Sequence, residues 1–254
     1  MIRAWIRLAG IAVWCLLAIP LPLVAGLVTL GRPAARRRSR TFLLTGFSRG
    51  ICRILGVRVE ATGARPPAAA FVAPNHWGYL DIFVLGSLYR GLFVSRADVA
   101  GWPLFGYLAS AGGTLYLQRE VRRDAARVGG EIGDALRDGL RVTAFLEGGA
   151  GPGTTVRPFR SALLESAVVA KTPCVPVAIR YTLPRDPDLD PSVVVSWEDG
   201  GFLAHVARLA RTRRIVARVT FLPPRTGGDR KELARWLEAD VAAALAERPS
   251  VLGT

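Results

Sequence analysis

Residues 69–96 read AAFVAPNHWGYLDIFVLGSLYRGLFVSR, and this stretch decides the fold. The apolar runs at 69–74 and 91–96 have the length and the flanking residues of buried strands. The segment between them, at about 80–90, is long enough for a helix. A helix between two buried strands is typical of an α/β domain.

The same alternation continues along the rest of the chain. Further strands are predicted at 57–61, 113–118, 141–147, 174–180, 192–197 and 214–222, and helices at about 101–110, 121–139, 160–171, 201–211 and 229–247. This order predicts an α/β fold with a mixed, largely parallel sheet flanked by helices. Because no long linker interrupts residues 59–254, we expect them to form a single domain.

The N-terminal segment has a different character. Residues 8–31 form a run of 24 uncharged residues, which is long enough to cross a bilayer. Pro20 and Pro22 near its middle should break or kink a helix, and residues 41–56 mix apolar residues with arginines at roughly helical spacing, as in an interfacial helix. We therefore predict a kinked or hairpin helical membrane anchor over residues 1–58. A single plain transmembrane span and a cleaved signal peptide are the alternatives.

The basic charge of the chain belongs to this N-terminal segment. The formal net charge is +14, but residues 1–58 contain ten arginines and no acidic residue, so the other 196 residues carry only +4. Nucleic-acid binding requires arginines on a solvated face, and here they abut the uncharged run, so we expect no nucleic-acid partner. The three cysteines, at 15, 52 and 174, have no metal-binding spacing, and we expect no metal site.

Catalytic side chains are predicted just after the apolar run at 69–74. Asn75 and His76 are adjacent there, and Asp81 follows five residues after the histidine. Histidine is the side chain best suited to accept a proton near neutral pH, and a nearby carboxylate would orient it. A loop entering a helix can bring Asp81 back to the imidazole. The spacing alone also fits a capping asparagine, a packed histidine and a solvated aspartate.

The segment NHWGYLD at 75–81 resembles the NHxxxxD signature of the glycerolipid acyltransferase family, the PlsC-like proteins. Four further segments resemble later motifs of that family in the family's order. They are GTLYLQR at 113–119, FLEGG at 145–149, PFRSAL at 158–163 and VPVAI at 175–179. The resemblance extends over roughly residues 70–180.

The resemblance implies an O-acyltransferase that uses no bound cofactor. His76, oriented by Asp81, would take the proton from a lysolipid hydroxyl, which attacks a fatty acyl thioester of coenzyme A or acyl-carrier protein. Groups near Asn75, Gly148 and Gly149 would stabilise the developing negative charge. Arg119 and Glu147 match positions associated with acceptor binding, and membrane lipids would be the partners.

The sequence also departs from the family pattern in a way that concerns the acceptor. The family's third motif commonly continues with threonine and arginine after the Glu-Gly pair, whereas here Gly149 and Ala150 follow. Arg157, at the end of the glycine-rich stretch 148–158, could replace the missing arginine; alternatively, the stretch is a flexible surface loop. This stretch resembles a bacterial subset of the family that includes lyso-ornithine lipid acyltransferases.

We expect the acceptor to be 1-acylglycerol-3-phosphate, giving phosphatidate, with lyso-ornithine lipid as the alternative. The protein should lie at the bacterial inner membrane with its catalytic domain on the cytoplasmic side, because five arginines follow the uncharged run.

A serine hydrolase is a competing interpretation. GFSRG at 46–50 matches GxSxG, and Ser48, Asp186 and His205 occur in the chain order of an α/β-hydrolase triad. However, a nucleophile elbow needs a buried strand before the serine, and the basic N-terminal segment precedes Ser48. We expect His205 to lie on a helix face instead.

Overall fold

The computed structural model of the chain describes residues 2–102, 104–118, 121–153, 155–197 and 201–247. Among these residues, one sheet of seven strands has the order β1-β7-β6-β2-β5-β3-β4. The strands are β1 (Val57–Thr62), β2 (Phe71–Pro74), β3 (Gly91–Arg96), β4 (Leu115–Leu117), β5 (Arg141–Ala144), β6 (Cys174–Thr182) and β7 (Ile215–Phe221).

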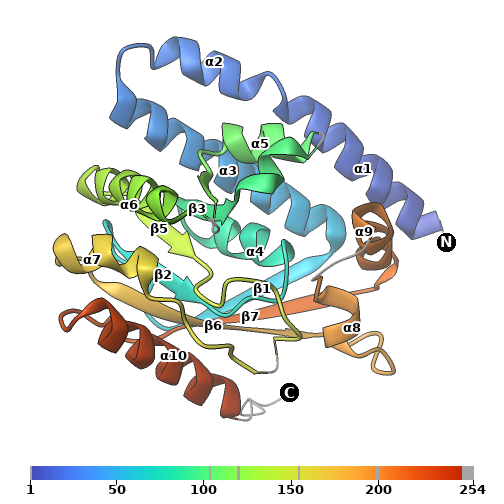
Figure 1. The fold of residues 1–254 in the computed structure, drawn as a ribbon. Coiled ribbons are helices and arrows are strands. Elements are labelled where there is room, and N and C mark those ends of the chain that lie inside the picture. The colour runs from blue at the N-terminus through green and yellow to red at the C-terminus, as the bar shows by residue number, and fades with distance from the viewer. Residues whose placement is uncertain (1, 103, 119–120, 154, 198–200, 248–254) are drawn as a thin grey trace.

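Helices cover both faces of this sheet (Figure 1). They are α1 (Ile2–Ala18), α2 (Leu21–Val28), α3 (Pro33–Leu55), α4 (Leu80–Leu88), α5 (Phe105–Ala111), α6 (Arg122–Arg137), α7 (Glu165–Val169), α8 (Pro191–Val195), α9 (Phe202–Arg211) and α10 (Arg230–Ala246), with short 3₁₀ helices η1 (Ala97–Gly101) and η2 (Ala162–Leu164).

The sheet is mixed and largely parallel, which confirms the predicted fold class. Neighbouring strands are parallel everywhere except at the β6–β7 pair, where Ile179 lies opposite Val219 in antiparallel register. The five strands from β6 to β4 therefore point the same way, and their carboxyl ends meet at one edge.

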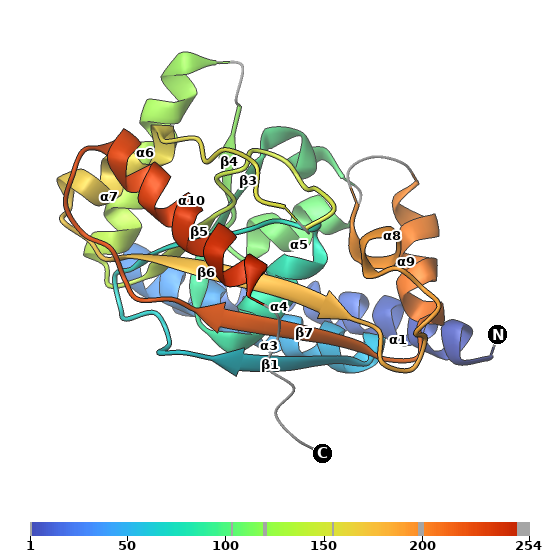
Figure 2. The same ribbon diagram turned by 90° about the horizontal axis from the view of Figure 1, so that it is seen from below.

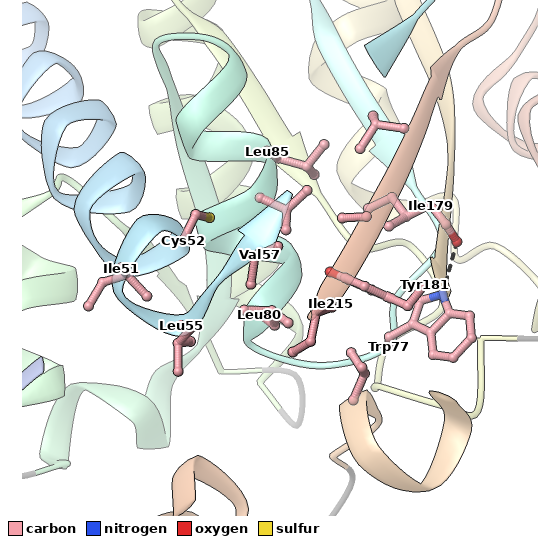
Figure 3. Packing of buried hydrophobic residues seen from close by; sticks show 14 of the residues in the cluster. Ile51, Cys52, Leu55, Val57, Trp77, Leu80, Leu85, Ile179, Tyr181 and Ile215 are labelled. Atoms are coloured by element: carbon pink, nitrogen blue, oxygen red, sulfur yellow. Dashed lines mark hydrogen bonds between the residues drawn. The ribbon is translucent and has the colours of Figure 1, made fainter. Parts of the chain in front are cut away.

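Alternate residues of the central strands enter two separate hydrophobic clusters. Val72 of β2 packs with α3 and α4 on one face, whereas its neighbours Phe71 and Ala73 pack with α6, α7 and α10 on the other. Figure 2 shows α10 lying over β6 on the face opposite α3 and α4. In Figure 3, side chains of α3 and α4 such as Leu55 and Leu80 point toward the same sheet. This alternation is the two-residue period of a strand.

One strand prediction is wrong. Residues 192–197 were expected to form a strand, but α8 occupies Pro191–Val195. The Asp190 carboxylate accepts a hydrogen bond of 2.8 Å from the Ser192 N–H, and Pro191 stands at the first helical position, so the local sequence starts a helix. A short valine run has no period that distinguishes the two structures.

The N-terminal segment forms a kinked hairpin along one side of the domain. The helix breaks between Ala18 and Leu21, as Pro20 predicts, and α3 returns antiparallel to α1 (Figure 1). The Trp14 indole N–H donates to the Phe47 carbonyl at 3.1 Å and fastens α1 to α3. Nearer the N-terminus of α1, the Arg7 guanidinium donates to the Thr212 carbonyl at the end of α9.

The hairpin has an apolar outer side and a buried inner side. Exposed apolar residues of α1 and α2 include Leu16, Leu23, Leu27 and Val28. The C-terminal half of α3 instead packs on α4 and enters the hydrophobic cluster beside β1. The expected division after residue 58 falls inside β1, and α3 takes part in both the hairpin and the core.

Candidate active site

The candidate site lies at the carboxyl ends of β2 and β5. His76 follows β2, and Phe145 to Gly149 follow β5, the adjacent parallel strand. After β2 the chain passes into α4 on one face of the sheet, and after β5 it passes into α7 on the other. In α/β sheets a crevice opens where neighbouring strands send their connections in opposite directions.

The structure brings His76 and Asp81 into direct contact. The imidazole Nδ1 lies 2.8 Å from Oδ2 of Asp81, which is fully buried in the first turn of α4. The same oxygen accepts hydrogen bonds from the backbone N–H groups of Trp77 and Gly78, at 2.7 and 3.1 Å. These amides at a helix N-terminus fix the carboxylate and favour a negative charge there.

Tyr181, which the sequence analysis did not single out, completes the contacts of Asp81. Its hydroxyl donates to Oδ1 of Asp81 at 2.7 Å. Burial, followed by the neighbouring charge of Asp81, raises the pKa of Tyr181 well above its usual value, so the hydroxyl stays protonated and remains a donor. The only sequence signal was a tyrosine near the end of the apolar strand at 174–180.

Changing Tyr181 to Phe should remove this bond without leaving a void. We expect the free energy of unfolding to fall by about 1.5–3 kcal/mol, the usual worth of a hydrogen bond to a charged group. We also expect kcat to fall, because Asp81 loses one of the contacts that orient it. Thermal unfolding and steady-state kinetics measure the two effects. Tyr89→Phe is the matched control, because the buried Tyr89 hydroxyl contacts Thr143 instead; it should keep the wild-type kcat.

The loop after β5 holds the backbone of His76. The Glu147 carboxylate accepts from the His76 N–H at 2.8 Å and from the Arg157 N–H at 3.1 Å, and the Gly151 N–H donates to the His76 carbonyl at 2.9 Å. Burial raises the pKa of Glu147, and the two N–H donors oppose that shift. Glu147 therefore links the two loops, and both of its oxygens are engaged.

The imidazole itself is partly exposed. Its side chain is 16% accessible, and the ring stacks on Phe145 with the ring centroids 3.8 Å apart. His76 lines a cavity of about 350 Å³ together with Gly148 and Gly149, while Tyr79 and Trp102 contribute to its apolar wall. A histidine held on one side by a carboxylate and open on the other to a cavity can accept a proton from a bound substrate.

The other predicted site residues lie in different places. Asn75 is fully buried: its amide donates to the Ile179 carbonyl at 3.1 Å and accepts from the Ile179 N–H at 2.7 Å, joining the end of β2 to β6. The Arg157 guanidinium lies close to Gly149 and Gly151. Arg119 lies outside the described residues.

Two further arginines line the cavity and were not assigned a role from the sequence. Arg96 forms a two-fold contact with Asp98, at 3.0 and 2.8 Å. The Arg160 guanidinium lies over Gly148, and no carboxylate of the described residues is within 4 Å of it. Gly148 has φ +80°, and a Cβ there would lie 2.7 Å from Nε of Arg160, so the turn needs glycine. The only sequence signal for Arg160 was its place in PFRSAL.

Two competing interpretations are wrong. Ser48 lies inside α3 rather than on a turn after a strand, and its buried hydroxyl makes no hydrogen bond to any described residue. His205 lies on α9, as expected, and bonds the Tyr79 hydroxyl at 2.7 Å. The glycine-rich stretch is not a loop without contacts, because Gly153 packs against the Trp77 ring.

Comparison with known proteins indicates the family of the chain. Residues 56–180 match the family model for acyltransferases. The lyso-ornithine lipid O-acyltransferases of Rhodobacter capsulatus and Pseudomonas aeruginosa are 35% and 32% identical to the chain; the alignments cover 78% and 93% of it and 75% and 87% of those proteins. The 1-acyl-sn-glycerol-3-phosphate acyltransferase of Neisseria meningitidis is 27% identical, over 85% of the chain and 84% of the relative.

A solved structure shares the fold. The crystal structure of the 1-acyl-sn-glycerophosphate acyltransferase PlsC from Thermotoga maritima superposes with a TM-score of 0.71 over 100% of this chain and 97% of that one, at 17% identity. The motifs, the fold and these relatives lead to one conclusion: the chain belongs to the glycerolipid acyltransferase family.

Proposed function

We propose that the protein transfers a fatty acyl group from an acyl thioester to a hydroxyl of a lysolipid, with His76 as general base and Asp81 as its orienting partner. The observation that carries this proposal is the 2.8 Å contact between Nδ1 of His76 and the buried Asp81 carboxylate, beside the 350 Å³ cavity. Because Asp81 accepts only, Nδ1 carries the proton and Nε2 is left to accept another.

In the proposed reaction Nε2 takes the proton from the acceptor hydroxyl as its oxygen attacks the thioester carbonyl. The carbonyl oxygen becomes negatively charged in the tetrahedral intermediate. When the carbon–sulfur bond breaks, the departing thiolate takes the proton from His76, and the ester product remains. The thioester is already activated, so no acyl-enzyme is required. The donor is acyl-coenzyme A or acyl-carrier protein.

A backbone amide is available for the negative charge. The Gly148 N–H already donates to the Phe145 carbonyl at 3.2 Å. The Gly149 N–H makes no hydrogen bond to any described residue, and Gly149 lines the cavity with His76. We therefore assign the oxyanion contact to Gly149 rather than to Gly148 or to Asn75, whose side chain is occupied by Ile179.

Two acceptors are supported by different observations. Lyso-ornithine lipid is favoured by the more identical relatives and by the missing threonine and arginine after Gly148. This reverses the order expected from the sequence. Lysophosphatidate is favoured by Arg160, a cation in the cavity without a carboxylate partner among the described residues, which suits a phosphate.

We place the N-terminal hairpin in the bilayer, where the acceptor resides. In the described part of the chain, one helical segment, Ile2–Val28, is long and apolar enough to cross a membrane, and only 11% of its most apolar window is buried by the rest of the protein. Because α1 is fastened to α3 and α9 on one side, we propose that the hairpin lies in one leaflet with its apolar side in the lipid. The leaflet would be the cytoplasmic one of the inner membrane.

Purified protein in detergent, offered acyl-coenzyme A with each acceptor in turn, tests this function. We expect turnover with lyso-ornithine lipid to exceed turnover with lysophosphatidate, and acyl-carrier protein should be compared as the donor. A preference for lysophosphatidate would overturn the acceptor assignment and leave the reaction type intact. If none of the three lipids, lyso-ornithine lipid, lysophosphatidate and lysophosphatidylglycerol, accepts an acyl group, the proposed function is wrong.

A further inference from the structure

A second cavity lies between the hairpin and the domain. It has a volume of about 270 Å³ and is formed by α1, α2, α3 and α5, with Trp14, Leu21, Phe47 and Leu108 among its lining residues. Among the described residues, it shares no lining residue with the cavity beside His76. We refer to it as the hairpin groove.

The lining of the hairpin groove is apolar throughout. None of its described lining residues is charged, and the indole N–H of Trp14 is already bonded to the Phe47 carbonyl. The groove opens outward, because its lining residues Leu17 and Phe42 are 60% and 56% exposed. Its mouth thus continues the apolar outer side of α1 and α2. A groove of this kind beside a membrane surface suits an alkyl chain, for which burial is worth about 0.8 kcal/mol per methylene group.

Two cations lie at one end of this groove. Arg36 and Arg40 stand one turn apart on α3, and Leu44 and Phe47 of the groove continue the same side of the helix. The stem of Arg40 packs beside Gly113, next to the lining residue Gly112. At 1.5 Å per residue, Arg40 and Phe47 are separated by about 10 Å along the helix.

The positive charge at this end is not compensated. No carboxylate of the described residues lies within 4 Å of either Arg36 or Arg40, whereas the intervening Arg37 is paired with Asp138 at 2.6 Å. Burial, followed by the charge of Arg36, lowers the pKa of Arg40. An anion bound between the two guanidinium groups would offset the repulsion between Arg36 and Arg40. It would also offset the free-energy cost of burying the charge of Arg40.

An apolar groove that leads to an uncompensated pair of arginines is complementary to an amphiphile with an anionic head. We propose that the hairpin groove binds one alkyl chain of an anionic bilayer phospholipid, whose phosphate contacts Arg36 and Arg40. This lipid is not the acyl acceptor. It fills the space between the hairpin and α5, where the Tyr107 hydroxyl donates to the Ile19 carbonyl at 2.8 Å, and so stabilises the hairpin against the domain.

Filling the hairpin groove with a larger side chain tests whether the alkyl chain of the lipid binds there. Gly46 lines the groove, and a Cβ at this residue would meet nothing within 4 Å, so a leucine there has room to start into the groove and we expect Gly46→Leu to occupy it. Gly26→Leu in α2 is the matched control, because Gly26 also faces open space and does not line the groove. Binding of phosphatidylglycerol is measured by native mass spectrometry of the full chain in detergent, without acyl donor.

We expect Gly46→Leu to weaken phosphatidylglycerol binding by about tenfold or more, the equivalent of two fewer buried methylene groups. Gly26→Leu should bind like the wild type. Changing both Arg36 and Arg40 to Gln should remove the preference for phosphatidylglycerol over phosphatidylcholine, and Arg53→Gln on the exposed side of α3 should not. Unchanged binding in Gly46→Leu would overturn the proposal. A raised KM for the acyl acceptor in that variant would also overturn it, because the groove would then belong to the substrate.

Discussion

His76→Ala is expected to lower kcat by about 10²–10⁴-fold, the usual contribution of a positioned general base. The variant keeps the cavity but lacks the imidazole that is proposed to take the acceptor proton. It should also keep its fold, because the imidazole is partly exposed and its side-chain contacts are with Asp81 and Phe145. KM for the lysolipid should change much less than kcat, since binding depends on the rest of the cavity.

The measurement is the initial rate of ester formation at saturating donor and acceptor, with the thermal unfolding midpoint recorded for each variant. Ser48→Ala is the control: it removes a buried hydroxyl that has no hydrogen-bond partner among the described residues, so it should be neutral or slightly stabilising. If Ser48→Ala loses activity and His76→Ala retains it, the chemistry assigned to His76 is wrong.

The two-residue and helical periods of the apolar residues were sufficient to predict most of the strands and helices. Buried strands such as β6, with Val175, Val177 and Ile179 on one face, are read directly from a short apolar run. The strand prediction at 192–197 was wrong because the helix cap at Asp190, and not a hydrophobic period, decides the structure of this segment. The hairpin was predictable from Pro20, but its docking on α9 through Arg7 depends on a pair distant in sequence.

The candidate site was predictable where its residues are close in sequence. Asp81 returns to His76 because the loop after β2 turns directly into the first turn of α4, as the spacing suggested. Tyr181 and Asp81 are 100 residues apart in the sequence, and the pairing of β2 with β6 brings them together, so their contact could not be predicted from the spacing. The same pairing occupies the side-chain amide of Asn75, which the family resemblance had placed near the developing negative charge. The sequence was sufficient to propose the chemistry, whereas sheet order decided which polar groups remained available for it.

Asp81→Asn is the second change with a large expected effect, because it separates the charge of the carboxylate from its shape. The amide oxygen can keep the hydrogen bonds from the Trp77 and Gly78 N–H groups, and the Tyr181 hydroxyl can turn to accept from the new NH₂. The fold should therefore survive. Without the negative charge, however, the His76 imidazolium formed during proton transfer loses the carboxylate bonded directly to its ring, and we expect kcat to fall by about 10²-fold or more.

Asp81→Ala distinguishes this loss from a loss of structure. It leaves the Trp77 and Gly78 N–H groups and the Tyr181 hydroxyl without their acceptor, at about 1–3 kcal/mol for each buried donor. We thus expect Asp81→Ala to lose both activity and thermal stability, and Asp81→Asn to lose activity alone. Kinetics and thermal unfolding of both variants provide the comparison. Wild-type kcat in Asp81→Asn would mean that Asp81 only shapes the loop, and the base would then work without a charged partner.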